Sequence, residues 1–161
     1  MTNDTKTSIQ LLDEVRIVLQ QVTEWTQRYE AALQATRQVL YDWQAQTDTI
    51  LWGGATEPLL GYDRAELPAT WDALQALVHP TDRAAIDHEQ AHPQASPSGS
   101  ALSYRLRRKD GGYVTVADQG LVFVDHTGTV VRRVGCLADI TWLPQSQKND
   151  GEGLNGLVGE R

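Results

Sequence analysis

The sequence predicts an α+β fold: a five-stranded antiparallel sheet with short helices over one face, preceded by one long amphipathic helix. Two observations carry this prediction. Runs in which apolar and polar residues alternate are separated by the turn sequences Asp110-Gly111 and Thr127-Gly128, and such turns are typical of antiparallel hairpins. The expected strands stand in groups of two and three rather than alternating with helices, which argues against a doubly wound parallel sheet.

Size and charge exclude several classes of protein. The chain has 161 residues and a formal net charge of −7, which fits one domain with an extension and argues against nucleic-acid binding, because phosphates require cationic partners. No apolar run is long enough to span a membrane, and no signal peptide opens the chain, so we expect a cytoplasmic protein. The single cysteine, Cys136, excludes an internal disulfide and a cysteine-based zinc site.

The first element is expected to be a helix over residues 8–35, which contain no Gly or Pro. Its apolar residues recur at spacings of three and four, as in a coiled-coil seam, and Ile17, Val18 and Trp25 widen the stripe. At about 1.5 Å per residue the helix is about 40 Å long, so it could lie on its own domain only in part. Its length favours a homodimer. The expected interface residues are Leu12, Val15, Leu19, Val22, Tyr29 and Leu33.

We expect three segments: a dimerisation helix over residues 1–36, a domain over 37–141, and a polar, disordered tail over 142–161. Threonine N-caps with nearby Pro and Gly mark short helices inside the domain. Its expected elements are strands over 39–45 and 49–52, helical turns over 56–61, 62–68 and 70–77, a longer helix over 79–91, a loop over 92–99 and three strands over 102–141.

Six short motifs in this order resemble the PAS domain, in the PAS fold-3 subgroup of bacterial sensor kinases and cyclases. They are Tyr41-Asp42-Trp43, Trp52, Leu60-Gly61-Tyr62, Leu77 to Arg83, Tyr104 to Gly111, and Arg133-Val134-Gly135 with Asp139-Ile140-Thr141. The resemblance implies a sensory module of signal transduction, as in two-component systems. In such modules a small ligand or cofactor often sits in the cup between sheet and helices, and flanking helices pass the signal to an effector domain or a partner protein.

The end of the chain departs from the family pattern. The closing motif of the family usually continues into a charged helix that leads to the effector. Here Thr141 is followed by Trp142-Leu143-Pro144 and a glycine-rich stretch, and both proline and glycine oppose a helix. Either the effector has been removed with its linker, or the chain is a free-standing module whose output leaves through the N-terminal helix or a partner.

Large apolar and aromatic residues on the expected sheet and helices are the candidates for lining the cup. The cup either holds a small molecule or is filled by these side chains, because residues of this kind are more often plain core. The second case corresponds to a ligand-free adaptor that binds another protein. The pocket candidates are Trp43, Trp52, Leu60, Trp71, Leu74, Ile86, Tyr104 and Val116.

The sequence offers weak cofactor candidates and no catalytic motif. Flavin photochemistry in the family uses a cysteine in a helix of the cup, whereas Cys136 falls in the last strand. A haem-based gas sensor would take an axial histidine from the longer helix, where His88 is the better candidate, although its acidic neighbours indicate a solvated side chain. No metal site, phosphate-binding glycine loop or nucleophile motif is recognisable, so we expect no enzyme activity.

Three residues are candidates for coupling the sheet to the linker. Arg105 alternates with Tyr104 and Leu106, which places it on the opposite face of its strand, where arginines usually form solvated ion pairs. The resemblance to the family suggests a more specific role, in which one arginine of the cluster Arg105, Arg107 and Arg108 pairs with Asp139 of the closing motif, next to Thr141.

Overall fold

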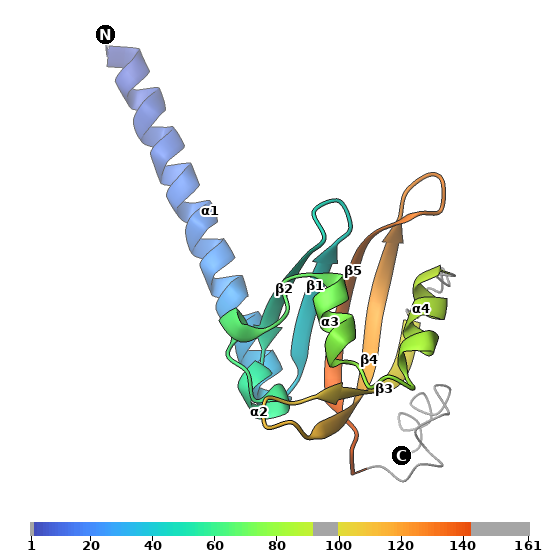
Figure 1. Ribbon diagram of the computed structural model, residues 1–161. Helices are drawn as coiled ribbons and strands as arrows, with labels where there is room; N and C mark the ends of the chain where they lie inside the picture. Colours follow the sequence, from blue (N-terminus) through green and yellow to red (C-terminus); the bar gives the residue numbers. More distant parts are fainter. Residues whose placement is uncertain (1, 92–99, 143–161) are drawn as a thin grey trace, which may run out of the picture.

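The structure is a computed structural model that describes residues 2–91 and 100–142 (Figure 1). The predicted loop over 92–99 and all but the first residue of the predicted tail lie outside the described residues. The elements, in order, are α1 (Thr2–Ala35), β1 (Val39–Gln44), β2 (Thr49–Gly54), α2 (Thr56–Leu60), the 3₁₀ turn η1 (Arg64–Glu66), α3 (Trp71–Leu77), α4 (Arg83–Ala91), β3 (Ser100–Arg107), β4 (Tyr113–Val124) and β5 (Val130–Asp139).

The strands form one sheet in the order β2-β1-β5-β4-β3, and all neighbouring strands are antiparallel. The predicted five-stranded antiparallel sheet is therefore confirmed. Strand boundaries differ from the predicted ones by one or two residues. We expected the second strand to end at Trp52, but Gly53 and Gly54 continue the ladder opposite Leu40 and Val39. The glycines are tolerated there because α1 packs against this end of β2.

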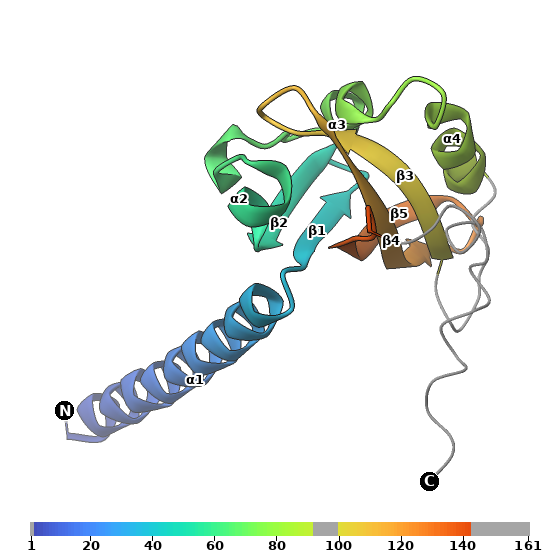
Figure 2. The same ribbon diagram turned by 90° about the horizontal axis from the view of Figure 1, so that it is seen from below.

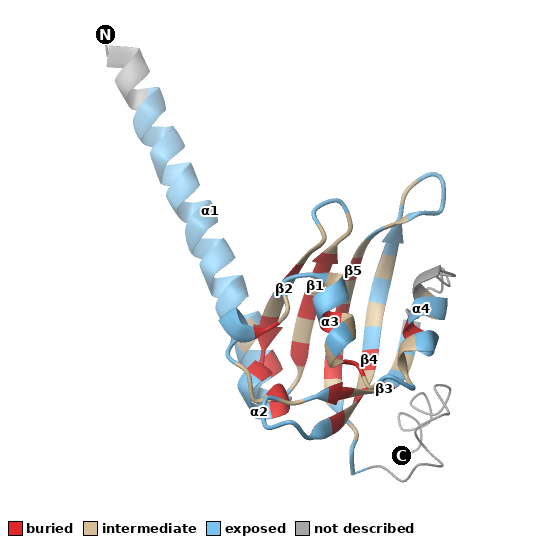
Figure 3. Cartoon of the chain, viewed as in Figure 1, coloured by how far each residue is buried: buried red, intermediate tan, exposed pale blue. Residues whose placement is uncertain are grey.

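The two faces of the sheet have different neighbours. The inner face carries residues such as Tyr41, Tyr104 and Leu137 and is covered by α2, α3 and α4 (Figure 2). The outer face carries the alternate residues, such as Leu40 and Leu121. Burial colouring shows the core between the inner face and the short helices, whereas α1 is exposed over most of its length (Figure 3). None of the helices in the described ranges is long and apolar enough to cross a membrane.

The last turns of α1 are attached to the end of β2. Leu33 is only 6% exposed, and the Gln34 side chain donates a hydrogen bond to the Gly54 carbonyl at 2.9 Å. The Glu30 carboxylate accepts from the Gly54 amide at 3.3 Å and forms an ion pair with Arg64. Gly54 has a φ of +78°, and a Cβ at this position would lie 2.9 Å from that of Leu33. Only glycine lets the helix approach this closely.

Candidate functional site

Four polar side chains meet in the middle of the inner face and form what we call the buried polar cluster: Tyr41, Tyr104, Asp118 and Arg133. The Asp118 carboxylate accepts from the Tyr41 hydroxyl at 2.9 and 3.0 Å and from the Tyr104 hydroxyl at 2.9 Å. Arg133 donates from Nε to the Tyr41 hydroxyl at 2.7 Å, and its Nη2 lies 3.5 Å from Asp118 Oδ2. The cluster therefore joins β1, β3, β4 and β5.

Strand alternation and the absence of a side chain at Gly135 make room for this cluster. Gly135 lies opposite Tyr41 on one side and Gly120 on the other. A Cβ on Gly135 would stand 2.5 Å from the Tyr41 hydroxyl oxygen, and a Cβ on Gly120 would stand 2.8 Å from the Val134 carbonyl. The Tyr41 ring can cross β5 and reach Asp118 only because Gly135 has no side chain.

Burial and charge act together in the cluster. Asp118 is 3% and Arg133 is 2% exposed. Burial raises the pKa of the Asp118 carboxyl, and Arg133 and the tyrosine hydroxyls oppose this only in part. Burial and the nearby Asp118 raise the pKa values of Tyr41 and Tyr104 well above the ordinary tyrosine value. Burial alone would lower the pKa of Arg133, but Tyr41 and Asp118 raise it overall, so Arg133 stays charged.

The tryptophans of the predicted cup are bonded within the fold. The rings of Trp43 and Trp71 pack at 5.2 Å, and the Trp43 indole donates to the Asp48 carboxylate at 2.9 Å. The Trp52 indole donates to the Pro68 carbonyl at 2.7 Å. The indole donors of Trp43 and Trp52 are therefore already used within the protein and are not available to orient a ligand.

The structure brings the predicted pocket residues into one core. Six of the eight are buried, whereas Trp52 and Trp71 are half-buried and pack against the others. A hollow between α4 and the sheet, lined by Glu89 and Arg133 together with Val122 and Val130, holds no volume open to water. In the described part of the molecule, the side chains themselves fill the cup at this point.

The predicted haem ligand lies elsewhere. His88 is exposed on α4, whereas Ile86 is the residue of this helix that enters the core. This placement gives no geometric support for axial ligation. Among residues 2–91 and 100–142, no group of three His, Cys, Asp or Glu side chains is arranged to hold a metal ion.

The predicted pairing of Arg105 with Asp139 is wrong. Arg105 donates to both carboxylate oxygens of Asp82, from Nε at 2.9 Å and from Nη2 at 2.7 Å. Since β3 is an edge strand and β4 separates it from β5, Arg105 lies nearer to the start of α4 than to Asp139. Asp139 instead accepts from the Thr141 amide at 2.8 Å, and the Thr141 hydroxyl accepts from the Thr115 amide at 3.1 Å. These bonds fasten the end of β5 to β4.

The predicted interface residues on α1 fall into two groups. Leu12 and Leu19 are 69% and 61% exposed, and Val15 and Val22 are also exposed. Tyr29 is partly exposed, and Leu33 is buried against its own domain. The seam that the sequence indicates is therefore free over its N-terminal part, while Leu33 belongs to the attachment of α1 and not to an exposed interface.

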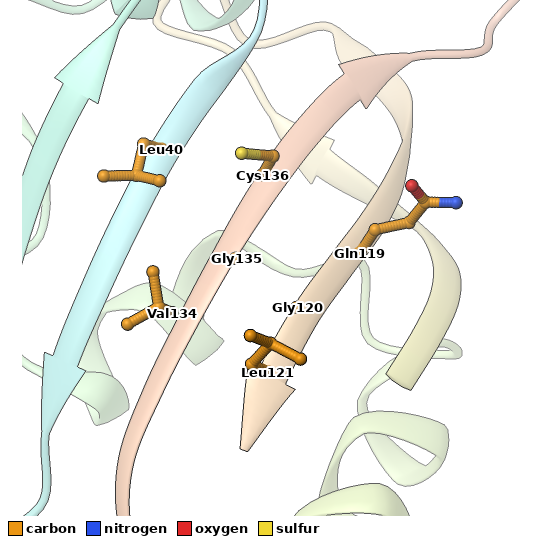
Figure 4. A pocket seen from close by; sticks show the side chains of 7 residues that line it. All are labelled: Leu40, Gln119, Gly120, Leu121, Val134, Gly135 and Cys136. Carbon is orange, nitrogen blue, oxygen red and sulfur yellow. The ribbon is translucent and has the colours of Figure 1, made fainter. Parts of the chain in front are cut away.

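The outer face contains a shallow hollow of about 240 Å³ (Figure 4). Its floor is the backbone of Gly120 and Gly135, and its walls are the side chains of Leu40, Gln119, Leu121, Val134 and Cys136. Burial raises the pKa of the Cys136 thiol above its ordinary value. Tyr41 packs on Gly135 from the inner side, so the buried polar cluster and this hollow lie on opposite sides of the same glycine backbone.

Sequence reasoning missed three members of the cluster, namely Tyr41, Asp118 and Arg133. A signal was present for Asp118. It follows Val114 and Val116 at intervals of two residues, so all three side chains lie on the same, inward face of the strand, and a carboxylate that points inward must find hydrogen-bond partners. Identifying those partners requires the strand order, since Tyr41 and Arg133 come from β1 and β5.

Comparison with known proteins agrees with this architecture. A family model described as the PAS fold matches residues 49–137. A comparison with curated protein sequences gave no match. Many solved structures match, at identities that speak for the fold alone. One is a sensory box histidine kinase/response regulator from Burkholderia thailandensis, with 24% identity, coverage of 71% of this chain and 85% of that chain, and a TM-score of 0.55.

Two further matches have the same TM-score of 0.55. The N-terminal domain of a diguanylate cyclase with PAS/PAC sensor from Marinobacter aquaeolei is 23% identical and covers 65% of this chain and 96% of its own. The PAS domain of an HTR-like protein from Haloarcula marismortui is 19% identical and covers 78% of this chain and 99% of its own.

Proposed function

The chain belongs to the PAS fold family, a family of sensory modules, and from this premise we propose that it is a non-enzymatic signalling module that dimerises through α1. The observation that carries the proposal is the contrast along α1. Its base is attached to β2 through Glu30, Leu33 and Gln34, whereas Leu12 and Leu19 are 69% and 61% exposed among the residues that the structure describes. Two such stripes in a parallel pair would bury each other.

The proposed mechanism is a change in the packing of paired α1 helices. A ligand or partner that binds at the cup or the sheet changes the position of β2, and the bonds from Glu30 and Gln34 to Gly54 transmit that change to the helix. Binding alters the output only to the extent that the ligand favours one arrangement over the other. The output itself, an effector domain or a partner protein, is read from the helix pair.

The internal hydrogen bonds of the tryptophans support a second candidate, a ligand-free interaction adaptor. The Trp43 and Trp52 donors are bonded within the fold, and the hollow at Arg133 admits no water. Native mass spectrometry of the purified protein separates the two candidates, since a retained small molecule supports the sensor and its absence after gentle extraction supports the adaptor. A visible absorption spectrum tests haem in the same sample.

Dimerisation is tested by multi-angle light scattering on a Leu12→Glu/Leu19→Glu variant. We expect the native chain to have twice the 17.9 kDa mass of one chain and the variant to have the single mass, because four buried carboxylates would repel within the seam. The matched control is Gln10→Glu/Gln20→Glu, which changes the charge equally on the side of α1 away from the apolar stripe. A monomeric native chain at tens of micromolar, or a double variant that stays dimeric, contradicts the proposal.

A further inference from the structure

We propose that Arg133 is shared between two carboxylates, Asp118 on the sheet and Glu89 on α4, and that proton binding to Asp118 moves it to Glu89. The inference goes beyond the proposed function because it names a signal, the pH of the surrounding solution. It does not depend on dimerisation through α1. It follows from the surroundings of Glu89, from the long contact between Arg133 and Asp118, and from the hydrogen bonds that hold Asp118.

Glu89 brings a second carboxylate from α4 to the buried polar cluster. Together with Arg133 it lines the hollow between α4 and the sheet, and its charge contributes to the raised pKa of Asp118. The Glu89 Oε1 atom is buried and accepts no hydrogen bond from any described residue, and the hollow admits no water. A buried carboxylate oxygen without a donor is unfavourable, so a neighbouring cation that turned toward it would stabilise it.

Arg133 is the cation that lines the same hollow. Its Nη2 lies 3.5 Å from Asp118 Oδ2, which is the longest contact within the cluster, whereas its Nε donates to the Tyr41 hydroxyl at 2.7 Å. The Asp118 carboxylate is held mainly by the hydroxyls of Tyr41 and Tyr104, at 2.9 Å each. The direct bond between Arg133 and Asp118 is therefore weak, and little is lost when the guanidinium turns from Asp118 to Glu89.

The charges at this place favour the uptake of one proton. Burial raises the pKa of Asp118 above its ordinary value of 3.8, and Glu89 adds to this, while Arg133 and the two tyrosine hydroxyls oppose it. Two carboxylates and one guanidinium carry a net charge of one electron, so a proton taken from the solvent makes the group neutral. The titratable and charged groups that face Asp118, from β1, β3, β5 and α4 in turn, are Tyr41, Tyr104, Arg133 and Glu89.

Protonation changes Asp118 from an acceptor into a donor. The Tyr41 hydroxyl oxygen, 2.9 and 3.0 Å from the two carboxylate oxygens, is an acceptor within reach of the new O–H. Arg133 Nε already donates to that oxygen, so the two donors compete for it. The Arg133 charge is also left in the interior without its carboxylate, which is strongly unfavourable. A turn of Arg133 to Glu89 removes both problems and joins β5 to α4.

The consequence is a change in how firmly α4 is held to the sheet. With Asp118 ionised, α4 is held through core contacts such as that of Ile86, and Glu89 adds no bond to β5. With Asp118 protonated, the pair of Arg133 and Glu89 adds one. Because the pKa of Asp118 is raised in the folded protein, the fold takes up this proton at a higher pH than the unfolded chain does. The stability of α4 should therefore rise as pH falls.

Hydrogen exchange of the α4 amides tests the inference, expressed as protection factors so that the intrinsic pH dependence of exchange is removed. We expect the native chain to show at least about fivefold greater protection at about pH 4.5 than at about pH 8. This range lies above the pKa of Asp82, about 2, so the separate contact at the start of α4 does not change within it. The same rise is expected in His88→Gln, which removes a histidine of α4 that could titrate in this range.

Two substitutions identify the carboxylates involved. Glu89→Gln keeps the shape of the side chain but removes the second partner of Arg133, so the protection of α4 should no longer depend on pH. Its matched control is Asp72→Asn, which removes an equal charge from an exposed position on α3 and should keep the native rise. Asp118→Asn imitates the protonated carboxyl, so α4 should already be protected at about pH 8 as strongly as the native chain is at about pH 4.5.

Several results would overturn the inference: protection of native α4 that does not change with pH, a rise that survives in Glu89→Gln, or a rise that disappears in His88→Gln or Asp72→Asn. A folded Asp118→Asn variant that keeps the weak protection of native α4 at about pH 8 would do the same. If Asp118→Asn does not fold, Glu89→Gln and its control still decide. None of these results bears on the mass measured by light scattering, so failure of the inference leaves the α1 dimer standing.

Discussion

The two faces of the sheet differ in how their side chains are satisfied. On the inner face even the charged groups Asp118 and Arg133 are buried and bonded to neighbouring strands. On the outer face Leu51 and Leu121 stand exposed around a shallow hollow. The inner face therefore holds the domain together, whereas the outer face leaves large apolar side chains uncovered among the described residues.

Helix α1 shows the same contrast between buried and exposed side chains within one element. The same heptad pattern contains Leu33, which is buried in its own domain, and Leu12, which is exposed. A straight helix drifts by about 20° per heptad from a strict seven-residue repeat, so residues in one seam need not face one neighbour. The position along the helix therefore decides whether a seam residue packs against its own domain or is exposed.

The largest expected effect is at the inner face. Asp118→Ala leaves the Arg133 charge buried without its carboxylate, and removal of one member of a buried ion pair costs about 3–5 kcal/mol. We expect this loss in the free energy of unfolding, measured by urea denaturation. Asp139→Ala removes a carboxylate from an exposed position at the end of β5 and should cost less than about 1 kcal/mol.

A double variant decides whether the charge itself is needed. Asp118→Leu/Arg133→Met replaces both charges with apolar side chains, and such replacements are often neutral or stabilising. We expect the double variant to recover most of the stability that Asp118→Ala loses. If Asp118→Ala is no more harmful than Asp139→Ala, the inner face does not hold the domain together as the contrast requires.

A smaller effect is expected from the two ends of α1. In the monomeric Leu12→Glu/Leu19→Glu background, Leu33→Ala should lower the free energy of unfolding by about 2–4 kcal/mol, because it empties a packed site against Gly54. Leu11→Ala in the same background should change it by less than about 0.5 kcal/mol, since Leu11 is exposed. Equal effects of the two substitutions would show that α1 is not divided into an attached base and a free stripe.

The sequence predicts the fold well because the signals for it are local. Hairpin turns such as Asp110-Gly111, strand alternation and helix caps each lie within a few residues, and together they predict the element order and the antiparallel sheet. The error at Gly53 and Gly54 arose because glycine usually ends a strand, whereas here it admits α1 beside β2. That reason depends on a neighbour from elsewhere in the chain.

The candidate site is predictable only in part. Large apolar residues such as Leu60 and Val116 could be assigned to the core from alternation and helical spacing. Pairs of charged or polar side chains from different strands could not be predicted, because the charges alone do not tell which strands are neighbours. Arg105 was paired in prediction with Asp139, but the edge position of β3 brings it to Asp82. For the same reason, the hydrogen bond from Tyr41 to Asp118 across β5 could not be predicted.

The smallest expected effect is at the rim of the inner face, where Asp82 holds the start of α4 to β3. Its hydrogen bonds from the Arg105 guanidinium keep the pKa of Asp82 at about 2, below its ordinary value of 3.8. A carboxyl whose pKa is lower in the folded state stabilises the fold fully above its unfolded pKa and loses this effect as pH falls through the folded value. The Asp82 contribution should therefore be lost between about pH 4 and pH 2.

The pH dependence distinguishes this rim contact from the buried polar cluster. Asp82→Asn should lower the free energy of unfolding by about 1–2 kcal/mol at pH 6, and its difference from the native chain should narrow as pH falls from 4 to 2. Arg105→Gln should behave in the same way, whereas Arg107→Gln, an equal change of charge at an exposed position on the same strand, should keep the native pH profile. A difference that stays constant down to pH 2 would mean that Asp82 does not act through its charge. The contrast between the faces would then be confined to the buried polar cluster.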